Sequence, residues 1–289
     1  MAFESVKQLL DTALATDASL WETVLEDDRK DRGTSREDSL AQMNRLWKAM
    51  KEAGASYRAE LRSSSGLSGG DGEKMRAYVR AGKAVSGEFL GEIITQALCM
   101  GECNACMKRI VAAPTAGSCG VLPAVFLPLF RHGTVSDEDI VRALYVAAGF
   151  GQVIAARASI SGAQGGCQAE IGSASAMAAS ALVFLKKGTP EQSADACAMA
   201  LMNLLGLVCD PVAGLVEVPC INRNVVGALN AVGCADMALA GIRSRIPPDE
   251  VIDAMRSVGD MMPEALRETG EGGLAATPTG AAVAKRVLT

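Results

Sequence analysis

Nine cysteines are the residues of this chain best suited to carry chemistry. Their number is odd, and the N-terminus reads MAFESVKQLLD, without the basic and apolar regions of a secretion signal. We therefore expect a cytoplasmic protein whose thiols are buried, catalytic or bound to metal rather than paired in disulfides. His132 is the only histidine, which excludes most zinc hydrolase and Ser-His-Asp schemes within this chain.

The first group of thiols, Cys99, Cys103 and Cys106, has C-x3-C-x2-C spacing, which resembles the cluster signature of radical-SAM enzymes. Those enzymes carry the signature on a loop after the first strand of a barrel, and this sequence shows no barrel pattern. The spacing also places all three thiols on one face of a helix. We interpret them as small hydrophobic residues packed in a core.

The second group consists of Cys167, Cys209 and Cys220, each beside a glycine or proline break and a predicted helix start. A thiol at a helix N-terminus feels the positive end of the helix dipole, which favours the thiolate that metals require. However, a C-x10-C pair with a distant third cysteine is not a local cluster motif. The spacing alone therefore leaves both a metal site and ordinary packing open. The remaining cysteines are interpreted as core residues: Cys119, Cys197 and Cys234.

The hydrophobic pattern around these thiols is helical, with few strand signals and no βαβ rhythm. The predicted fold class is mainly α: a helical domain with buried Ala/Gly-rich helices and glycine-rich site loops. Residues 1–60 are predicted to form an N-terminal helical segment and residues 61–289 the catalytic helical domain, together one continuous globular unit. Four glycine-rich loops are expected around one cavity: residues 63–72, 112–120, 159–167 and 209–222.

Capping residues predict where three of the helices begin. The predicted starts are Thr34 with Glu37, Ser136 with Asp139, and Thr189 with Gln192. We expect the second of these helices to run to about Gly149 and the third to end at Gly206. Residues 268–280 are predicted to form a loop.

Charge and composition exclude several classes of protein. The net charge is −5 and no dense run of Lys or Arg appears, which argues against nucleic-acid binding. No stretch approaches the ~18 apolar residues expected of a membrane span, residues 172–185 coming nearest, so no membrane association is expected. The glycines match neither the dinucleotide fingerprint nor the P-loop pattern, so nucleotide binding is not indicated.

Four long segments resemble the α chain of the two-chain iron–sulfur L-serine dehydratase family. They are AAPTAGSCGVLP (112–123), SISGAQGGCQAEIGSASAMAA (159–179), GLVCDPVAGLVEVPCINRN (206–224) and RETGEGGLAATPTG (267–280). The stretch GLSGGDGEKMRAYVRAGKAVSG (66–87) is similar to that family as well. The resemblance covers most of residues 60–280, and its motifs are long and specific.

The resemblance implies a [4Fe–4S] cluster held by three cysteines, which fall on Cys167, Cys209 and Cys220, with the fourth iron open to substrate. The implied reaction is β-elimination of water from L-serine, without pyridoxal phosphate. The aminoacrylate product becomes an imine, which is hydrolysed to pyruvate and ammonia. Hydroxide is a poor leaving group, so an open Lewis-acidic iron suits this reaction.

Polar residues in the matching motifs are candidates to line the substrate pocket. For each of them the alternative is a hydrogen bond that only stabilises a loop. The candidates are Asn104, Thr115, Ser118, Ser161, Gln164 and Asn222.

The resemblance also implies a partner. Single-chain members of the family carry an additional domain with a Ser-Ser-His-Thr loop, and some end in a cysteine that occupies the open iron. This sequence contains no such loop and ends KRVLT. We therefore expect a hetero-oligomer in which a separate β chain supplies the loop. That chain should dock on an exposed patch, apolar at its centre, near the cluster loops.

Three other interpretations remain open from the sequence. One is a related lyase that releases sulfide from L-cysteine with the same cluster. Another is a non-enzymatic iron–sulfur electron carrier, although such carriers normally hold every iron with protein ligands. The third is a structural helical subunit with reduced thiols. Product assays, substrate-induced changes in a cluster spectrum, and anaerobic iron and sulfide analysis distinguish them.

Overall fold

The computed structural model describes residues 3–288, and within this range it contains helices and no β-strand. The mainly α prediction is therefore confirmed. The first seven helices are α1 (Val6–Ala15), α2 (Leu20–Arg32), α3 (Arg36–Ser56), α4 (Asp71–Arg80), α5 (Gly87–Ala105), α6 (Val121–Arg131) and α7 (Asp137–Arg157). The later ones are α8 (Gly162–Gly165), α9 (Ser173–Leu185), α10 (Pro190–Met202), α11 (Cys220–Leu239), α12 (Pro248–Met261) and α13 (Pro278–Leu288).

Short tight turns complete the chain between these helices. A π-helical turn, η1 (Gln168–Gly172), leads directly into α9. Three 3-10 turns follow later: η2 (Val212–Gly214), η3 (Glu264–Leu266) and η4 (Gly273–Ala276).

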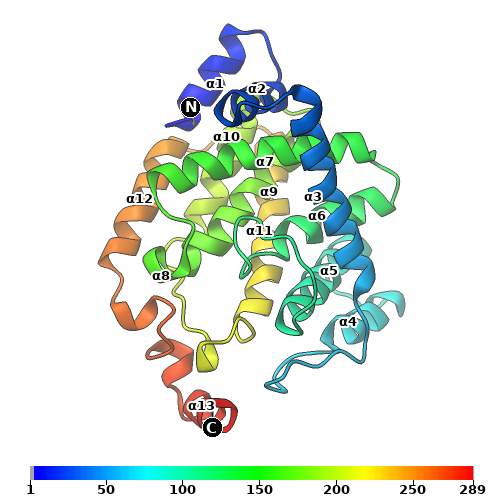
Figure 1. Ribbon diagram of the computed structural model, residues 1–289, viewed down its shortest axis with the longest axis vertical. Helices are drawn as coiled ribbons and strands as arrows, with labels where there is room; N and C mark the ends of the chain where they lie inside the picture. The colour runs from blue at the N-terminus through cyan, green and yellow to red at the C-terminus, as the bar shows by residue number, and fades with distance from the viewer. Residues whose placement is uncertain (1–2, 289) are drawn as a thin grey trace.

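Helix α9 lies at the centre of the bundle and packs against α7, α10 and α11 (Figure 1). Every residue from Ser173 to Val183 is buried, and most of them are Ala or Ser. Small side chains let the neighbouring helices approach closely. A Cβ on Gly227 of α11, for example, would lie only 2.8 Å from the side chain of Ile171. The predicted Ala/Gly-rich buried helices are therefore present.

The first three helices share this core. Val6, Leu9, Trp47 and Met50 belong to the same cluster of buried residues as the side chains of α6 to α10. Helix α2 packs on α7, and α3 crosses α5, α6 and α7. The apolar packing is thus continuous across residue 60.

The predicted helix ends were only partly right. The Ser136–Asp139 and Thr189–Gln192 capping boxes are both present. For α3, however, the cap is Ser35, whose hydroxyl accepts from Asp38 N at 3.0 Å, so the predicted Thr34–Glu37 box is wrong by one residue.

The predicted helix C-termini also need correction. Helix α7 passes Gly149 and continues to Arg157. Gly149 serves close packing rather than helix termination, since a Cβ there would lie 2.4 Å from Val24. Helix α10 ends at Met202, before Gly206. Residues 268–280 were predicted to be a loop, but they contain η4 and the start of α13.

Two segments are long and apolar enough to cross a membrane by length and composition, namely α7 and residues 168–185. Most of both segments is buried inside the protein, as in the core helices of a globular domain.

Candidate active site

A glycine turn and a π-helical turn set the position of Cys167. Gly166 has φ +75° and ψ −178°, a conformation essentially restricted to glycine. Cys167 follows it as the N-cap of η1. π-helical turns are rare and occur frequently at functional sites. Here the turn brings Glu170 into the region that the Cys167 thiol occupies, close enough for its charge to affect that thiol.

Cys209 is held in a different way. Its N–H donates to Leu266 O at 2.8 Å, and its carbonyl accepts from Glu268 N at 2.8 Å. These two bonds form an isolated parallel bridge between Cys209 and Arg267. The prediction that Cys209 lies beside a helix start is therefore wrong: extended backbone from the C-terminal region holds it.

Cys220 is the first residue of α11, so its predicted place at a helix N-terminus is confirmed. Asn224, one turn later, donates from Nδ2 to Cys220 O at 2.9 Å and to Gly117 O at 2.7 Å. Its Oδ1 accepts from Gly120 N at 2.8 Å. The same side chain therefore fixes both the start of α11 and the loop of residues 112–120.

The three thiols come from separate segments but lie within electrostatic range of one another. A thiolate at Cys167 or Cys220 would raise the pKa of Cys209, and one at Cys220 would raise that of Cys167. All three side chains are buried, with 2%, 3% and 8% exposure for Cys167, Cys209 and Cys220. This is a donor set of the kind that holds iron–sulfur clusters.

The protein environment alone does not favour the thiolates. Burial raises the pKa of Cys167 and of Cys220 to about 12, and it raises that of Cys209 as well. The helix-dipole effect expected from the sequence is therefore outweighed by desolvation. Coordination to a metal deprotonates a thiol outright, so a bound cluster would supply the missing stabilisation.

Gly162, in α8, leaves space beside the thiols. A Cβ at this position would lie 3.0 Å from Cys209 Sγ, 2.9 Å from Glu170 Oε2 and 3.2 Å from Glu268 Oε2. Within residues 3–288, no group of three or more His, Cys, Asp or Glu residues is arranged to hold a single metal ion. A cluster spaces its ligands more widely, because its thiolates bind different irons. The thiols, with this glycine cradle beside them, fit such a group.

A buried ion pair supports the cysteines. Arg223 Nη2 donates to Asp210 Oδ1 at 2.8 Å, and Arg223 Nη1 donates to Val208 O at 2.7 Å. The Arg223 guanidinium also lies close enough to the Cys167 thiol to lower its pKa. The other Asp210 oxygen accepts from Leu274 N at 2.8 Å. One pair thus links the segments of all three cysteines to the C-terminal turn η4.

Sequence reasoning missed this pair and two glutamates. Glu170 Oε1 accepts from Thr115 Oγ1 at 2.7 Å. Burial raises the pKa of Glu170, the hydrogen bond from Thr115 opposes this, and the nearby Glu268 raises it further. Glu268 itself has φ +67°, which is uncommon for a residue other than glycine. The available signal was proximity in sequence, since Glu170 and Arg223 each follow a cysteine by three residues.

Three of the predicted pocket residues meet in the 112–120 loop. Thr115 Oγ1 lies 3.1 Å from Ser118 Oγ, and Ser118 is fully buried. Asn104, near the end of α5, donates to Ala116 O at 3.2 Å. Thr115 therefore contacts a site carboxylate, whereas Ser118 and Asn104 make hydrogen bonds that shape the loop.

The other three predicted residues are placed differently. Ser161 precedes Gly162, and its carbonyl accepts from Gly165 N at 2.9 Å. The exposed Gln164 accepts from Ser159 Oγ at 2.8 Å. Asn222 is exposed on the first turn of α11. No described contact joins Gln164 or Asn222 to the cysteines.

Contacts link several of the glycine loops, while their predicted arrangement around one cavity stays a prediction. Ser65 of the first loop donates to Glu217 Oε1 of the fourth at 2.8 Å, and the second loop reaches Glu170 through Thr115. A pocket of about 470 Å³ beside Gln164 is lined by residues of the third loop, by α12 and by Arg267. The first, second and fourth loops contribute no residue to its lining.

Comparison with known proteins identifies the family. The family model described as "Serine dehydratase alpha chain" matches residues 15–275. The chain is 49% identical over 286 residues to the "Probable L-serine dehydratase, alpha chain" of Bacillus subtilis, covering 99% of this chain and 95% of that protein. It is 40% identical to the "L-serine dehydratase, alpha chain" of Peptoniphilus asaccharolyticus, covering 98% of each. This helical protein therefore belongs to the serine dehydratase alpha chain family.

A longer relative is matched only in part. "L-serine dehydratase 1" of Escherichia coli is 45% identical over 182 residues, which cover 62% of this chain but 40% of that protein. The resemblance to the α chains of Bacillus subtilis and Peptoniphilus asaccharolyticus, by contrast, extends along at least 95% of both sequences.

Proposed function

We propose that this chain is the α chain of a two-chain L-serine dehydratase, which eliminates water from L-serine to give pyruvate and ammonia. The proposal includes a [4Fe–4S] cluster held by Cys167, Cys209 and Cys220. The observation that carries it is the approach of three buried thiols from three separate segments, beside a glycine cradle and two carboxylates. The names of the full-length relatives support the substrate and the reaction.

The cluster, when bound, would supply a Lewis acid for the departing hydroxyl group. The chain's own residues would supply the rest. Glu170 Oε2 faces the space beside Cys209 and is the carboxylate best placed to take the Cα proton. The hydrogen bond from Thr115 to Oε1 fixes the orientation of that carboxylate and leaves Oε2 for the substrate.

The Arg223–Asp210 pair would hold the loops in place around the substrate. The Arg223 guanidinium lowers the pKa of the Cys167 thiol against the larger opposing effect of burial. The pair also bonds to the backbone of both neighbouring segments. Its positive end would partly balance the negative charge of three thiolates.

We further propose that a β chain completes the site and supplies the Ser-Ser-His-Thr loop. The histidine of this chain caps α6 and lies 3.1 Å from Glu92, outside the group of residues around the thiols. Two apolar side chains beside the site are exposed and suit a docking partner: Val218, next to Pro219 and Cys220, and Leu274, whose N–H binds Asp210.

The test is anaerobic reconstitution with iron and sulfide, with and without the co-expressed β chain. We expect four irons per chain by the definition of the cluster, and pyruvate from L-serine that depends on the β chain. Sulfide release from L-cysteine in place of pyruvate from L-serine would move the assignment to the cysteine lyase. An intact cluster with no turnover of either amino acid, and no spectral change on adding them, would indicate the electron carrier.

A further inference from the structure

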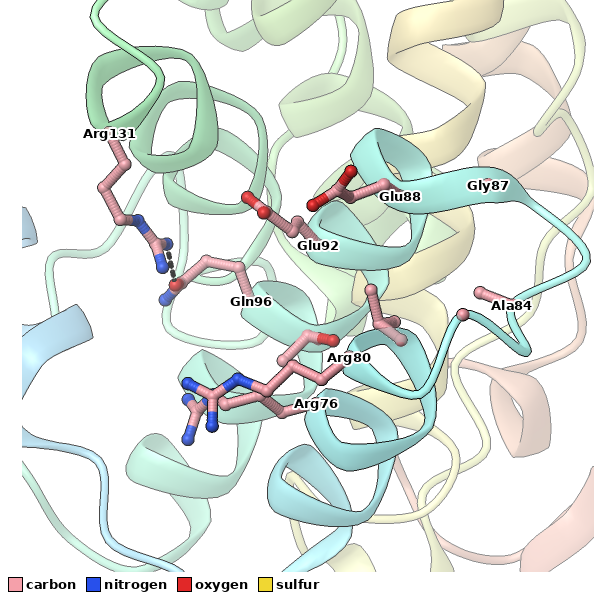
Figure 2. A pocket seen from close by; sticks show the side chains of 11 residues that line it. Arg76, Arg80, Ala84, Gly87, Glu88, Glu92, Gln96 and Arg131 are labelled. Atoms are coloured by element: carbon pink, nitrogen blue, oxygen red, sulfur yellow. Dashed lines mark hydrogen bonds between the residues drawn. The ribbon is translucent and has the colours of Figure 1, made fainter.

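A pocket of about 350 Å³ lies between α4, the first half of α5 and the end of α6 (Figure 2). Its volume is within the range of small-molecule sites. Thr95 and Gln96, with 7% and 4% exposure, lie among its lining residues. None of its lining residues belongs to the group around Cys167, Cys209 and Cys220.

Two pairs of like charges line this pocket. Arg76 and Arg80 are one turn apart on α4, and Glu88 and Glu92 are one turn apart on α5. Residues four apart are neighbours on a helix surface, and like charges there weaken the helix. Figure 2 shows the two guanidinium groups of Arg76 and Arg80 on one side of the pocket and the two carboxylates on the other.

No described ion pair joins the arginines of α4 to the glutamates of α5 across the pocket. Arg76 pairs with Glu73 on its own helix, and Glu92 pairs with His132 at 3.1 Å. In the part of the chain that the structure describes, Arg80 and Glu88 make no ion pair or side-chain hydrogen bond. Arg80 and Glu88, both exposed, therefore line the pocket without a partner from the described part of the chain.

A third cation adds to the positive side. Arg131, at the end of α6, also lines the pocket and donates to Gln96 Oε1. Burial is the main reason that the pKa of Arg131 is lowered; the nearby Glu92 opposes this shift, and Arg76 lowers the pKa further. Two guanidinium groups close enough to repel each other are stabilised by an anion placed between them.

We infer that this pocket binds a small zwitterion of the α-amino-acid type, with its carboxylate toward Arg76 and Arg80 and its ammonium group toward Glu88 and Glu92. Guanidinium groups bind carboxylates through two parallel hydrogen bonds, and an ammonium group donates three. A simple anion would leave Glu88 without a partner, and a simple cation would leave Arg80 without one. A zwitterion satisfies both sides at once.

Isothermal titration calorimetry, which measures the affinity of the full chain for L-alanine, tests this inference. L-alanine carries the same two charges as L-serine but has no hydroxyl to eliminate. Acetate, ethylammonium and inorganic phosphate are the comparison ligands, each lacking one feature of the zwitterion. The variants are Arg80→Gln and Glu88→Gln, and Lys74→Gln on an exposed position of the same helix is the matched control. Unchanged thermal unfolding shows that each variant is folded.

We expect L-alanine to bind more tightly than any comparison ligand. Each pocket variant should weaken that binding by about tenfold or more through loss of a charge-assisted hydrogen bond, while Lys74→Gln leaves it unchanged. The double variant Arg80→Glu/Glu88→Arg should recover part of the affinity, because a zwitterion can bind in the reverse orientation. Equal affinity for phosphate would overturn the zwitterion assignment. Alanine binding that neither variant alters, or no binding at all, would overturn the site.

Discussion

The molecule contains two groups of three cysteines, and their surroundings differ more than their burial does. Cys99 and Cys103 lie one turn apart on α5, and Cys106 caps that helix. The first two form a small apolar cluster with Tyr57. Cys167, Cys209 and Cys220 instead come from three segments and face Arg223, Glu170 and Glu268. The group with the more familiar spacing thus lies on one helix in a largely apolar cluster, where Arg76 Nη2 also donates to Cys99 Sγ at 3.4 Å.

Burial does not separate the two groups. It raises the pKa of Cys99 to about 12, as it does for Cys167 and Cys220. What separates them is the chemistry within reach. Near Cys99, Glu102 accepts from Tyr57 Oη at 2.6 Å and from the N–H groups that begin α4, which is a structural use of a carboxylate. Near Cys209, the Oε2 atoms of Glu170 and Glu268 lie around the position that a Cβ on Gly162 would occupy.

The largest expected difference is in bound iron. Cys167→Ala should lose the cluster iron, and with it all activity, because a cluster of this kind needs each of its three protein ligands. Cys103→Ala, on the other group, should retain both iron and activity. Iron and sulfide analysis after anaerobic reconstitution measures the contrast. Equal iron in both variants would remove the ligand assignment, and loss only in Cys103→Ala would reverse it.

The two buried glutamates provide the next contrast. Glu170→Gln should lower kcat by about 10²–10⁴-fold, the usual contribution of a positioned base, while the cluster spectrum stays intact. Glu102→Gln should leave kcat nearly unchanged but lower the free energy of unfolding by about 1–3 kcal/mol, since it weakens hydrogen bonds to a buried charge. Steady-state kinetics and urea unfolding of both variants distinguish the catalytic role of Glu170 from the structural role of Glu102. A Glu170→Gln enzyme with normal kcat would exclude this residue as the base.

The ion pair that supports the cysteines should matter for folding as well. Asp210 and Arg223 have side-chain exposures of 5% and 13%. Asp210→Ala would leave the guanidinium buried without its partner and should destabilise the chain by about 3–5 kcal/mol. Asp11→Asn, which breaks an exposed pair with Lys7, should change stability by less than about 1 kcal/mol. Similar unfolding midpoints for the two variants would contradict the importance of the buried pair.

Local patterns predicted much of the fold from the sequence. The caps at Ser136 and Thr189 were found because their partners lie three residues away. The cap of α3 was misplaced because Thr34 and Ser35 are both suitable and only the backbone geometry selects Ser35. Helix α13 was missed because the threonine and glycine around Pro278 are typical of loops, although proline is also common in the first turn of a helix.

The candidate site was less predictable, because tertiary contacts build it. Cys209 owes its position to the backbone of Leu266 and Glu268, more than fifty residues later in the sequence, and no local pattern indicates that pairing. The i, i+4 spacing of residues on one helix face would have identified the correct asparagine at the start of α11. Asn224 is four residues after Cys220 and therefore on the same face, whereas Asn222 is two residues after it and points elsewhere. The buried, bonded residue is Asn224, with 2% exposure.

The smallest expected effect tests the space beside the thiols. Gly162→Ala adds one methyl group that would lie 3.0 Å from Cys209 Sγ and 2.9 Å from Glu170 Oε2, tighter than ordinary contacts. The φ of Gly162 is not in the left-handed region, so the backbone accepts alanine, and the effect should come from the filled space alone. We expect about 10–100-fold lower iron retention or kcat, as for other changes next to metal ligands.

Gly233→Ala is the matched control, because a Cβ there meets no atom within 4 Å and the residue lies inside α11. It should leave iron and kcat unchanged and raise stability by up to about 1 kcal/mol, since alanine is the better helix former. The comparison is made on reconstituted proteins by iron analysis, kinetics and thermal unfolding. If Gly162→Ala keeps full iron and full activity, the space beside Cys209 and Glu170 is not where cluster and substrate meet. Glu170 would then lose the geometric argument for its role.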